Sequence, residues 1–188
     1  MVWWETHPVP IVRPDHVDDP VLDDYRSLRG RERDDALYAE GPTVVDRLLA
    51  SSLDVRSVLL STAAYERFGA QVAERVGESV PVIVVDRETL RGVVGFDLHR
   101  GAIALADRPV DRDPADVLVD ARLVVALEGI NDHENLGAIA RSALGLGADA
   151  LLLDPTCADP WYRRSVRVSM GALLHLPVAR ALDWSGTL

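Results

Sequence analysis

Two amides, a glycine and an arginine occur at fixed spacing in one short stretch of the chain. In the pattern N-x3-N-x-G-x3-R-S-x4-G, the matching residues are Asn131, Asn135, Gly137, Arg141, Ser142 and Gly147. A strand-like apolar run, 123–127, precedes the stretch and another, 150–153, follows it. In open α/β sheets, ligands bind where a strand leads into a helix. Amide and guanidinium groups there can hydrogen-bond hydroxyl or phosphate oxygens, so the stretch predicts a binding crevice.

The apolar residues of this stretch predict a helix that begins beside Asn135. Leu136, Ile139, Ala143 and Leu146 recur at helical spacing, and Gly147 is placed to end the helix. Asn135 stands where an asparagine side chain can cap the first free amides. Arg141 would then lie about 9 Å beyond the cap, near the crevice. In the purely structural alternative, both asparagines are loop and cap residues, Gly137 is a close-packing site and Arg141 a surface charge.

A second polar and apolar pattern spans residues 161–177, after Asp154-Pro155. Its apolar residues share a broad helical face, which we interpret as core: Val166, Met170, Leu173 and Leu174. An adjoining arc carries three arginines, which can be solvated surface or contacts to RNA phosphates: Arg163, Arg164 and Arg167. Gly171 is interpreted as a contact between helix and sheet rather than as part of a ligand site.

Composition predicts a globular protein of a reducing compartment. The 188 residues are 48% hydrophobic, and the single Cys157 excludes an internal disulfide. The first residues lack signal-peptide features, and no apolar run approaches about 18 residues, so we expect a cytoplasmic protein without a membrane span. The histidines lack metal-ligand spacing, so no metal site is expected. A net charge of −10 argues against tight nonspecific RNA binding.

Alternating strand-like and helical runs also fill the first half of the chain. They predict strands at 36–39, 58–60, 81–85 and 101–106, and helices at 42–50, 63–76 and from Asp86 to before Gly92. A charged segment with two prolines then separates the halves. We therefore expect an N-terminal arm at 1–20 anchored by Trp3 and Trp4, an α/β/α domain at 21–107, a linker at 108–119 and a parallel-sheet domain at 120–188.

The ordered pair of patterns in residues 123–177 resembles the SpoU/TrmH family of RNA ribose methyltransferases, within the knotted SPOUT class. The N-terminal half is similar to that family's substrate domain, itself like a small RNA-binding ribosomal protein, through 39–42 and 99–101 after an arginine-rich start. The resemblance implies an α/β fold with a Rossmann-like parallel sheet, S-adenosylmethionine as cofactor, rRNA or tRNA as substrate and a homodimer in the complete enzyme.

The resemblance also implies roles for individual residues. Arg141 and Asn135 are the expected catalytic residues, with Arg141 acting on a ribose 2′-hydroxyl and Asn135 positioning it. The expected substrate contacts are Asn131, Gly137, Arg163, Arg164 and Arg167. Since the pKa of arginine lies above about 12, Arg141 is a poor proton acceptor. It can instead stabilise the developing alkoxide or hold the adjacent phosphate, and the sequence does not choose between these roles.

Two later signatures of the family, a glycine- and glutamate-containing loop and a Ser-Leu-Asn segment, do not occur before Leu188. They form the knot and most of the cofactor pocket, so we expect that pocket beyond Leu188 and little turnover by these 188 residues alone. Two functions remain open. The first is a 2′-O-ribose methyltransferase; the second is a noncatalytic RNA-binding protein with a degenerate methyltransferase domain.

Overall fold

The computed structural model describes residues 9–187, which fall into two compact units that divide between Arg108 and Pro109. Residues 1–8 of the expected N-terminal arm, with Trp3 and Trp4, lie outside the described residues, whereas Ile11–Val12 of the same arm forms an edge strand of the first sheet. No helix within 9–187 is long and apolar enough to cross a membrane.

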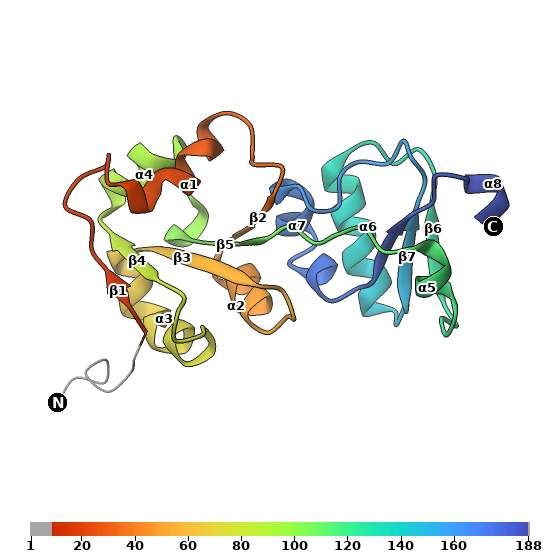
Figure 1. Ribbon diagram of the computed structural model, residues 1–188, viewed down its shortest axis with the longest axis horizontal. Helices are drawn as coiled ribbons and strands as arrows, with labels where there is room; N and C mark the ends of the chain where they lie inside the picture. The colour runs from red at the N-terminus through yellow and green to blue at the C-terminus, as the bar shows by residue number, and fades with distance from the viewer. Residues whose placement is uncertain (1–8, 188) are drawn as a thin grey trace. The chain divides into compact units, whose positions relative to one another are not determined.

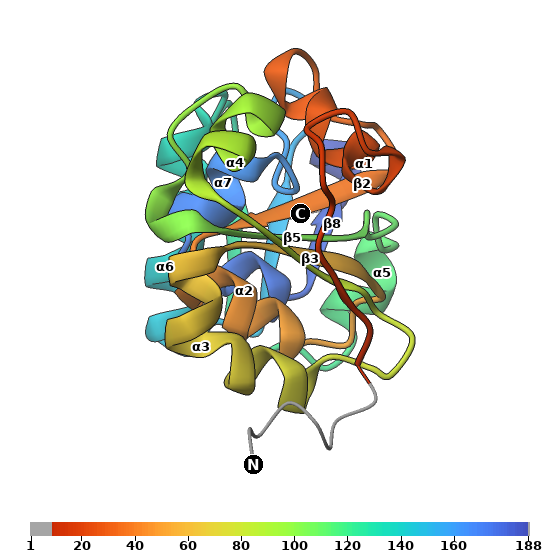
Figure 2. The same ribbon diagram turned by 90° about the vertical axis from the view of Figure 1, so that its left-hand side faces the viewer.

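The N-terminal unit is a five-stranded mixed sheet covered by helices on both faces (Figures 1 and 2). Its strands are β1 Ile11–Val12, β2 Ala36–Glu40, β3 Val55–Ser61, β4 Val82–Val85 and β5 Ala102–Asp107, in the order β1-β4-β3-β5-β2. Its helices are α1 Asp23–Arg26, α2 Pro42–Leu49, α3 Thr62–Arg75 and α4 Arg87–Val94, with short 3-10 turns at Pro20–Leu22, Ser27–Arg29 and His99–Gly101. β3 and β4 run parallel, whereas β5 is antiparallel to both β2 and β3.

Successive side chains along each strand point to opposite faces of the sheet, so they contact the helices on both faces. Tyr38, Leu59, Ile83 and Leu105 pack with Tyr25 and with the apolar residues of α4. Figure 1 shows α1 and α4 on this side of the sheet and α2 and α3 on the other. This is the three-layer arrangement expected of half-buried strands.

Helix α4 extends further than the sequence indicates. Asp86 caps it as predicted, since its carboxylate accepts a hydrogen bond from the Thr89 amide at 2.8 Å. The predicted end before Gly92 is wrong, because the helix continues to Val94. Gly95, with φ of 83°, ends it in the left-handed conformation that glycine adopts without strain.

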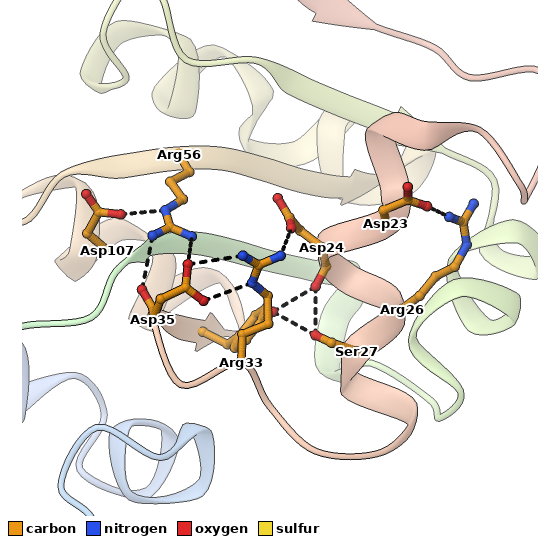
Figure 3. Close-up of polar contacts among 9 residues, drawn as sticks. Asp23, Asp24, Arg26, Ser27, Arg33, Asp35, Arg56 and Asp107 are labelled. Carbon is orange, nitrogen blue, oxygen red and sulfur yellow. Dashed lines mark hydrogen bonds and ion pairs between the residues drawn. The ribbon is translucent and has the colours of Figure 1, made fainter.

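The arginine-rich start of this unit is neutralised within the fold. Arg26 pairs with Asp23, Arg31 with Asp34, and Arg33 with Asp24 and Asp35. Figure 3 shows the resulting network: Arg33 lies between Asp24 and Asp35, and Arg56 between Asp35 and Asp107. The network joins the segment after α1 to β3 and β5. These guanidinium groups are therefore committed to aspartates of the same unit.

The C-terminal unit is a parallel sheet of three strands, β6 Val124–Leu127, β7 Ala150–Leu153 and β8 Val178–Arg180, in that order. Its helices are α5 Pro114–Leu118, α6 His133–Gly145, α7 Arg163–Val168 and α8 Trp184–Thr187, with a 3-10 turn at Ala172–Leu174. α5 packs against β7 and β8, and α6 and α7 lie on the opposite side of the sheet (Figure 1). This unit has the parallel, Rossmann-like topology expected from the sequence.

The structure of residues 161–177 differs in two details from the single helical face that the sequence predicts. α7 ends at Val168, and Met170 and Gly171 both have positive φ, 56° and 81°. The chain therefore turns sharply here, so these residues do not lie on one continuous helix. Val166, Leu173 and Leu174 are nevertheless buried, as expected of core residues, whereas Met170 is partly exposed. Gly171 adopts the left-handed conformation at this turn, which glycine tolerates without strain.

Helix α6 packs on α7 through the backbone at Gly137. A Cβ placed on Gly137 would lie 2.6 Å from the Ser165 carbonyl oxygen and 3.0 Å from the Ser169 amide nitrogen. Neighbouring positions on α6, Leu136, Ala140 and Ala143, are buried, whereas the predicted core residue Leu146 is 81% exposed. Gly147, with φ of 81°, ends the helix as predicted. The buried stripe is displaced because α7, as well as the sheet, covers α6.

Lowering the pH should weaken the network around Asp35. Hydrogen bonds from Arg33 and then Arg56 hold the pKa of Asp35 well below its ordinary value. Its stabilising effect is therefore present above the unfolded-state pKa of about 3.9 and is lost as the pH falls through the lower folded-state pKa. Asp35→Asn should lower the melting temperature at pH 7, and the difference from wild type should shrink toward pH 3. Asp34→Asn, which removes a single more exposed pair, is the control; equal effects of both variants at pH 7 would contradict this role.

Gly137→Ala should destabilise the C-terminal unit, since the new methyl group meets the α7 backbone rather than a flexible side chain. We expect a loss of about 1–3 kcal/mol, the usual cost of overpacking. Gly145→Ala is the matched control, because it lies on the same helix with no atom within 4 Å of its added Cβ. That control should be neutral or stabilise by up to ~1 kcal/mol. Urea denaturation of both variants measures the difference, and equal stabilities would refute the tight contact.

Candidate functional site

The candidate site lies at the carboxyl edge of the three parallel strands. Leu127, Leu153 and the last residue of β8, Arg180, stand side by side in register. The loops that follow β6 and β7 therefore emerge next to each other. This edge is where open parallel sheets bind ligands.

The loop after β6 places two exposed asparagines at the start of α6. Asp132 caps this helix, accepting a hydrogen bond from the Asn135 amide at 2.8 Å. The expectation that Asn135 itself is the cap is wrong: it is the third residue of the helix and its side chain is exposed. The aspartate before His133 and Glu134 is a helix-start signal that identifies the earlier cap. Asn131 is also exposed, and among residues 9–187 neither side-chain amide has a hydrogen-bond partner.

Arg141 lies further along α6 than expected. Because the helix begins at His133, Arg141 is about 12 Å from its start, by the usual rise of 1.5 Å per residue. Its side chain is exposed and has no ion-pair partner among the described residues. A guanidinium of this kind is available for a bidentate contact to a phosphate or hydroxyl oxygen.

The start of α7 lies against the start of α6. The His133 and Tyr162 ring centroids are 4.5 Å apart, and Arg164 Nε is 3.5 Å from Glu134 Oε1. Arg164 is exposed, and Arg163 and Arg167 are partly exposed. The fold therefore brings Arg164 next to the asparagine-bearing turn, and Arg163 and Arg167 lie on the same short helix.

Gly137 does not belong to the exposed surface of this site. It is buried against Ser165 and Ser169, so a direct contact with substrate, expected from the sequence, is not available to it. Its lack of a side chain instead permits the approach of α7. The structural alternative holds for this residue.

Arg180 organises the loop after β7, a role that the sequence analysis missed. Its guanidinium donates hydrogen bonds to the carbonyl oxygens of Asp154 at 2.9 Å, Cys157 at 3.1 Å and Ala158 at 3.2 Å. The Ala158 amide in turn donates to the Ile130 carbonyl at 2.8 Å, which ties this loop to the one after β6. No local sequence pattern predicts these hydrogen bonds, because Arg180 and its acceptors are 22–26 residues apart in the chain.

Two titratable groups in the same loop have shifted pKa values: the shift favours the ionised carboxylate of Asp154 and the neutral thiol of Cys157. Burial by itself would raise the pKa of Asp154, but contacts with Cys157 and Thr156 outweigh it and hold the pKa below its ordinary value. Burial raises the pKa of the Cys157 thiol, whose sulfur lies 3.2 Å from the Leu127 carbonyl oxygen. A raised thiol pKa disfavours the nucleophilic thiolate. Within the described part of the chain, no cluster of three or more histidines, cysteines or acids could hold a metal ion.

The site therefore presents hydrogen-bond donors rather than a nucleophile. The exposed amides can donate to and accept from a hydroxyl, whereas the guanidinium only donates. Such a set can bind and orient a ribose or phosphate group. It also offers positive charge where an oxyanion would develop.

Comparison with known proteins agrees with this geometry. The family model described as the SpoU rRNA Methylase family matches residues 122–188. An uncharacterized tRNA/rRNA methyltransferase of Mycobacterium tuberculosis is 43% identical over 175 residues, covering 89% of this chain and 59% of the relative. One from Mycobacterium ulcerans is 34% identical over 148 residues, covering 71% and 47%. The chain thus spans 59% or less of the length of these relatives.

Solved structures share the fold. An AdoMet-bound rRNA methyltransferase from Sinorhizobium meliloti has a TM-score of 0.71 at 23% identity, covering 91% of this chain and 65% of that one. The SpoU methyltransferase AviRb from Streptomyces viridochromogenes, in complex with AdoMet, has a TM-score of 0.71 at 21% identity, covering 89% and 65%. The family match over residues 122–188 and the 43% identity to a tRNA/rRNA methyltransferase show that the chain belongs to the SpoU/TrmH family, and the solved structures show the fold that it shares with them.

Proposed function

We propose that this protein methylates the ribose 2′-hydroxyl of a nucleotide in rRNA or tRNA, with S-adenosylmethionine as methyl donor. The position of Asn135 and Arg141 carries the proposal: both are exposed on α6, which follows β6 at the carboxyl edge of the sheet, inside the segment that matches the family. The relatives' names and the AdoMet bound in two neighbours support the substrate class and the donor.

The reaction needs an oriented hydroxyl whose oxygen becomes more nucleophilic as its proton leaves to an acceptor, so that this oxygen can take the methyl group while the donor leaves as S-adenosylhomocysteine. The amides of Asn131 and Asn135 can hold the ribose, since each both donates and accepts hydrogen bonds. Arg141 stabilises the negative charge that develops on the 2′-oxygen, a role suited to a group that stays protonated. S-adenosylmethionine supplies an electrophilic methyl group for this oxygen.

The two units divide the work in this proposal. Residues 120–188 contribute chemistry and residues 21–107 bind the RNA. Residues 108–119 connect them, and within this stretch α5 packs against β7 and β8 rather than forming an extended linker. Arg163, Arg164 and Arg167 of α7 contact phosphates close to the reacting ribose, because the start of α7 adjoins the start of α6. Gly137 contributes only by permitting that packing.

The test is direct detection of the product. The full-length protein is incubated with rRNA and tRNA and with isotopically labelled S-adenosylmethionine, and the RNA is digested to nucleosides for mass spectrometry. We expect label in a 2′-O-methylnucleoside. Label in a base would refute the ribose assignment, and RNA binding without label would favour a noncatalytic RNA-binding protein.

Replacing Arg141 should separate chemistry from RNA binding. If Arg141 stabilises the developing oxyanion, Arg141→Ala in the full-length protein should lower kcat by about 10²–10³-fold, the usual effect of losing one preorganised donor. RNA affinity should change by less than about tenfold. Arg141→Lys should restore little, because an ammonium does not reproduce the forked guanidinium. A normal single-turnover rate for Arg141→Ala at saturating RNA would leave Arg141 only a phosphate contact.

Changes on α7 should have the opposite effect. Arg163→Ala/Arg167→Ala should weaken RNA binding and reduce its salt dependence by roughly one unit of slope for each phosphate that the variant no longer neutralises. The single-turnover rate at saturating RNA should be preserved. Arg122→Ala, at an exposed arginine outside α7, is the control. Binding and salt dependence unchanged from wild type would exclude phosphate contacts by these arginines.

A further inference from the structure

A cavity in the N-terminal unit lies at the carboxyl ends of the parallel strands β3 and β4. Its volume is about 460 Å³, and it is lined by the first turns of α3 and α4 and by residues 96–98, 100 and 101. We name it the α3–α4 pocket. This volume falls in the range of small-molecule sites in proteins.

The α3–α4 pocket is basic in an acidic protein. Its lining includes four arginines and two aspartates, a net of +2, whereas the whole chain carries −10. The arginines are Arg67, Arg87, Arg91 and Arg100. They are spread between positions 67 and 100, so the sequence contains no run of charged residues that would predict this basic pocket.

The two aspartates are already engaged. The Asp86 carboxylate accepts hydrogen bonds from the Thr89 amide and hydroxyl at 2.8 and 2.9 Å, and these lower its pKa. Asp97 Oδ1 lies 4.0 Å from both Arg87 and Arg91. Arg67 and Arg100 are exposed and have no ion-pair partner among residues 9–187. Two guanidinium groups of the pocket are therefore available to an anion.

The backbone fixes one of these arginines at the pocket. Arg100 has φ of 55°, an unusual conformation for a residue with a side chain. Gly101, with φ of 66°, approaches the start of α3 so closely that an added Cβ would lie 2.2 Å from Ser61 Oγ. Ser61 in turn caps α3 through the Ala64 amide at 3.1 Å. Strained backbone held in this way is typical of ligand sites.

An apolar wall accompanies the cations. Leu90, Phe96 and Leu98 line the same cavity, and Phe96 and Leu98 are only partly buried where they pack on the core. A phosphate ion would use the arginines and leave this wall unused. A nucleotide fits both parts, because unpaired RNA bases stack on aromatic side chains while arginines hold the phosphate.

We propose that the α3–α4 pocket binds one unpaired nucleotide of an RNA chain, with its phosphate at Arg67 and Arg100 and its base against Phe96 and Leu98. This inference rests on the proposed function, since it assigns to the N-terminal unit a defined contact with the RNA substrate. It places a single-stranded element of that RNA at this unit.

The test uses fluorescence anisotropy with a labelled single-stranded RNA of about 12 nucleotides, within the usual span of a single-strand site, and the same RNA in a duplex. The pocket variant is Arg67→Gln/Arg100→Asn, where asparagine tolerates the positive φ. The control is Arg31→Gln/Arg122→Asn, which removes the same charge at two exposed arginines outside the pocket. The pocket variant should bind the single strand at least about tenfold more weakly, and its salt slope should fall by roughly 0.7 for each phosphate that it no longer neutralises. The control should weaken binding by less than about threefold, as expected from net charge alone.

A third variant separates stacking from charge. Phe96→Leu should weaken single-strand binding by at least about fivefold without changing the salt slope, as expected when a base-stacking partner is removed. Duplex affinity should be unaffected by Phe96→Leu. In an amide NMR titration with adenosine 5′-monophosphate, the largest shifts should fall at residues 62–64 and 96–101. Circular dichroism melting confirms that each variant is folded, and Arg67→Gln alone suffices if the double variant is not.

The outcomes distinguish this inference from the proposed function. RNA binding by wild type with equal losses of affinity in the pocket and control variants overturns the α3–α4 pocket and leaves the methyltransferase proposal standing. An unchanged single-strand affinity in Phe96→Leu overturns the nucleotide assignment. Absence of any RNA binding by the wild-type protein overturns both proposals.

Discussion

The backbone contact between α6 and α7 at Gly137 is the constraint on which the candidate site depends. Ser165 and Ser169, on the facing turn, are fully buried, and Ser165 Oγ donates to the Asp159 carbonyl at 2.8 Å. With no side chain between them, the starts of the two helices meet, as the His133–Tyr162 and Glu134–Arg164 contacts show. Asparagines from one signature and arginines from the other thereby reach the same edge of the sheet. A bulkier residue at 137 would separate them.

The arginines of this chain illustrate the difference between proximity in sequence and proximity in space. Residues 26–33 contain four arginines, yet Arg26, Arg31 and Arg33 are paired with aspartates of their own unit. The arginines of the α3–α4 pocket are spread from position 67 to position 100 and converge because β3 and β4 are parallel and adjacent. Acidic residues near a cationic run therefore decide whether it remains available to a polyanion. In an acidic protein, this leaves few places where arginines could contact a polyanion.

Much of the local structure follows from the sequence. The alternation of strands and helices, the cap at Asp86 and the glycine that ends α6 all depend on residues a few positions apart. The cap of α6 also depends on a local residue, but the prediction chose the wrong one. Aspartate and asparagine both cap helices, and the cap is Asp132, three residues before the predicted Asn135. The antiparallel direction of β5 has no such local signature, because it is set by pairing with β2 and β3 across the sheet.

The sequence by itself determined the family resemblance, the α/β class and the identity of the exposed polar residues on α6, because spacing along a helix or strand encodes them. The tertiary structure decided which of these residues can meet a ligand. It buried Gly137, turned the chain at Met170 and Gly171, and placed Arg180 against the carbonyls of Asp154 and Cys157. It also gathered Arg67 and Arg100 around one cavity. These outcomes depend on contacts between segments distant in the chain, and periodicity within one segment carries no information about its neighbours in space.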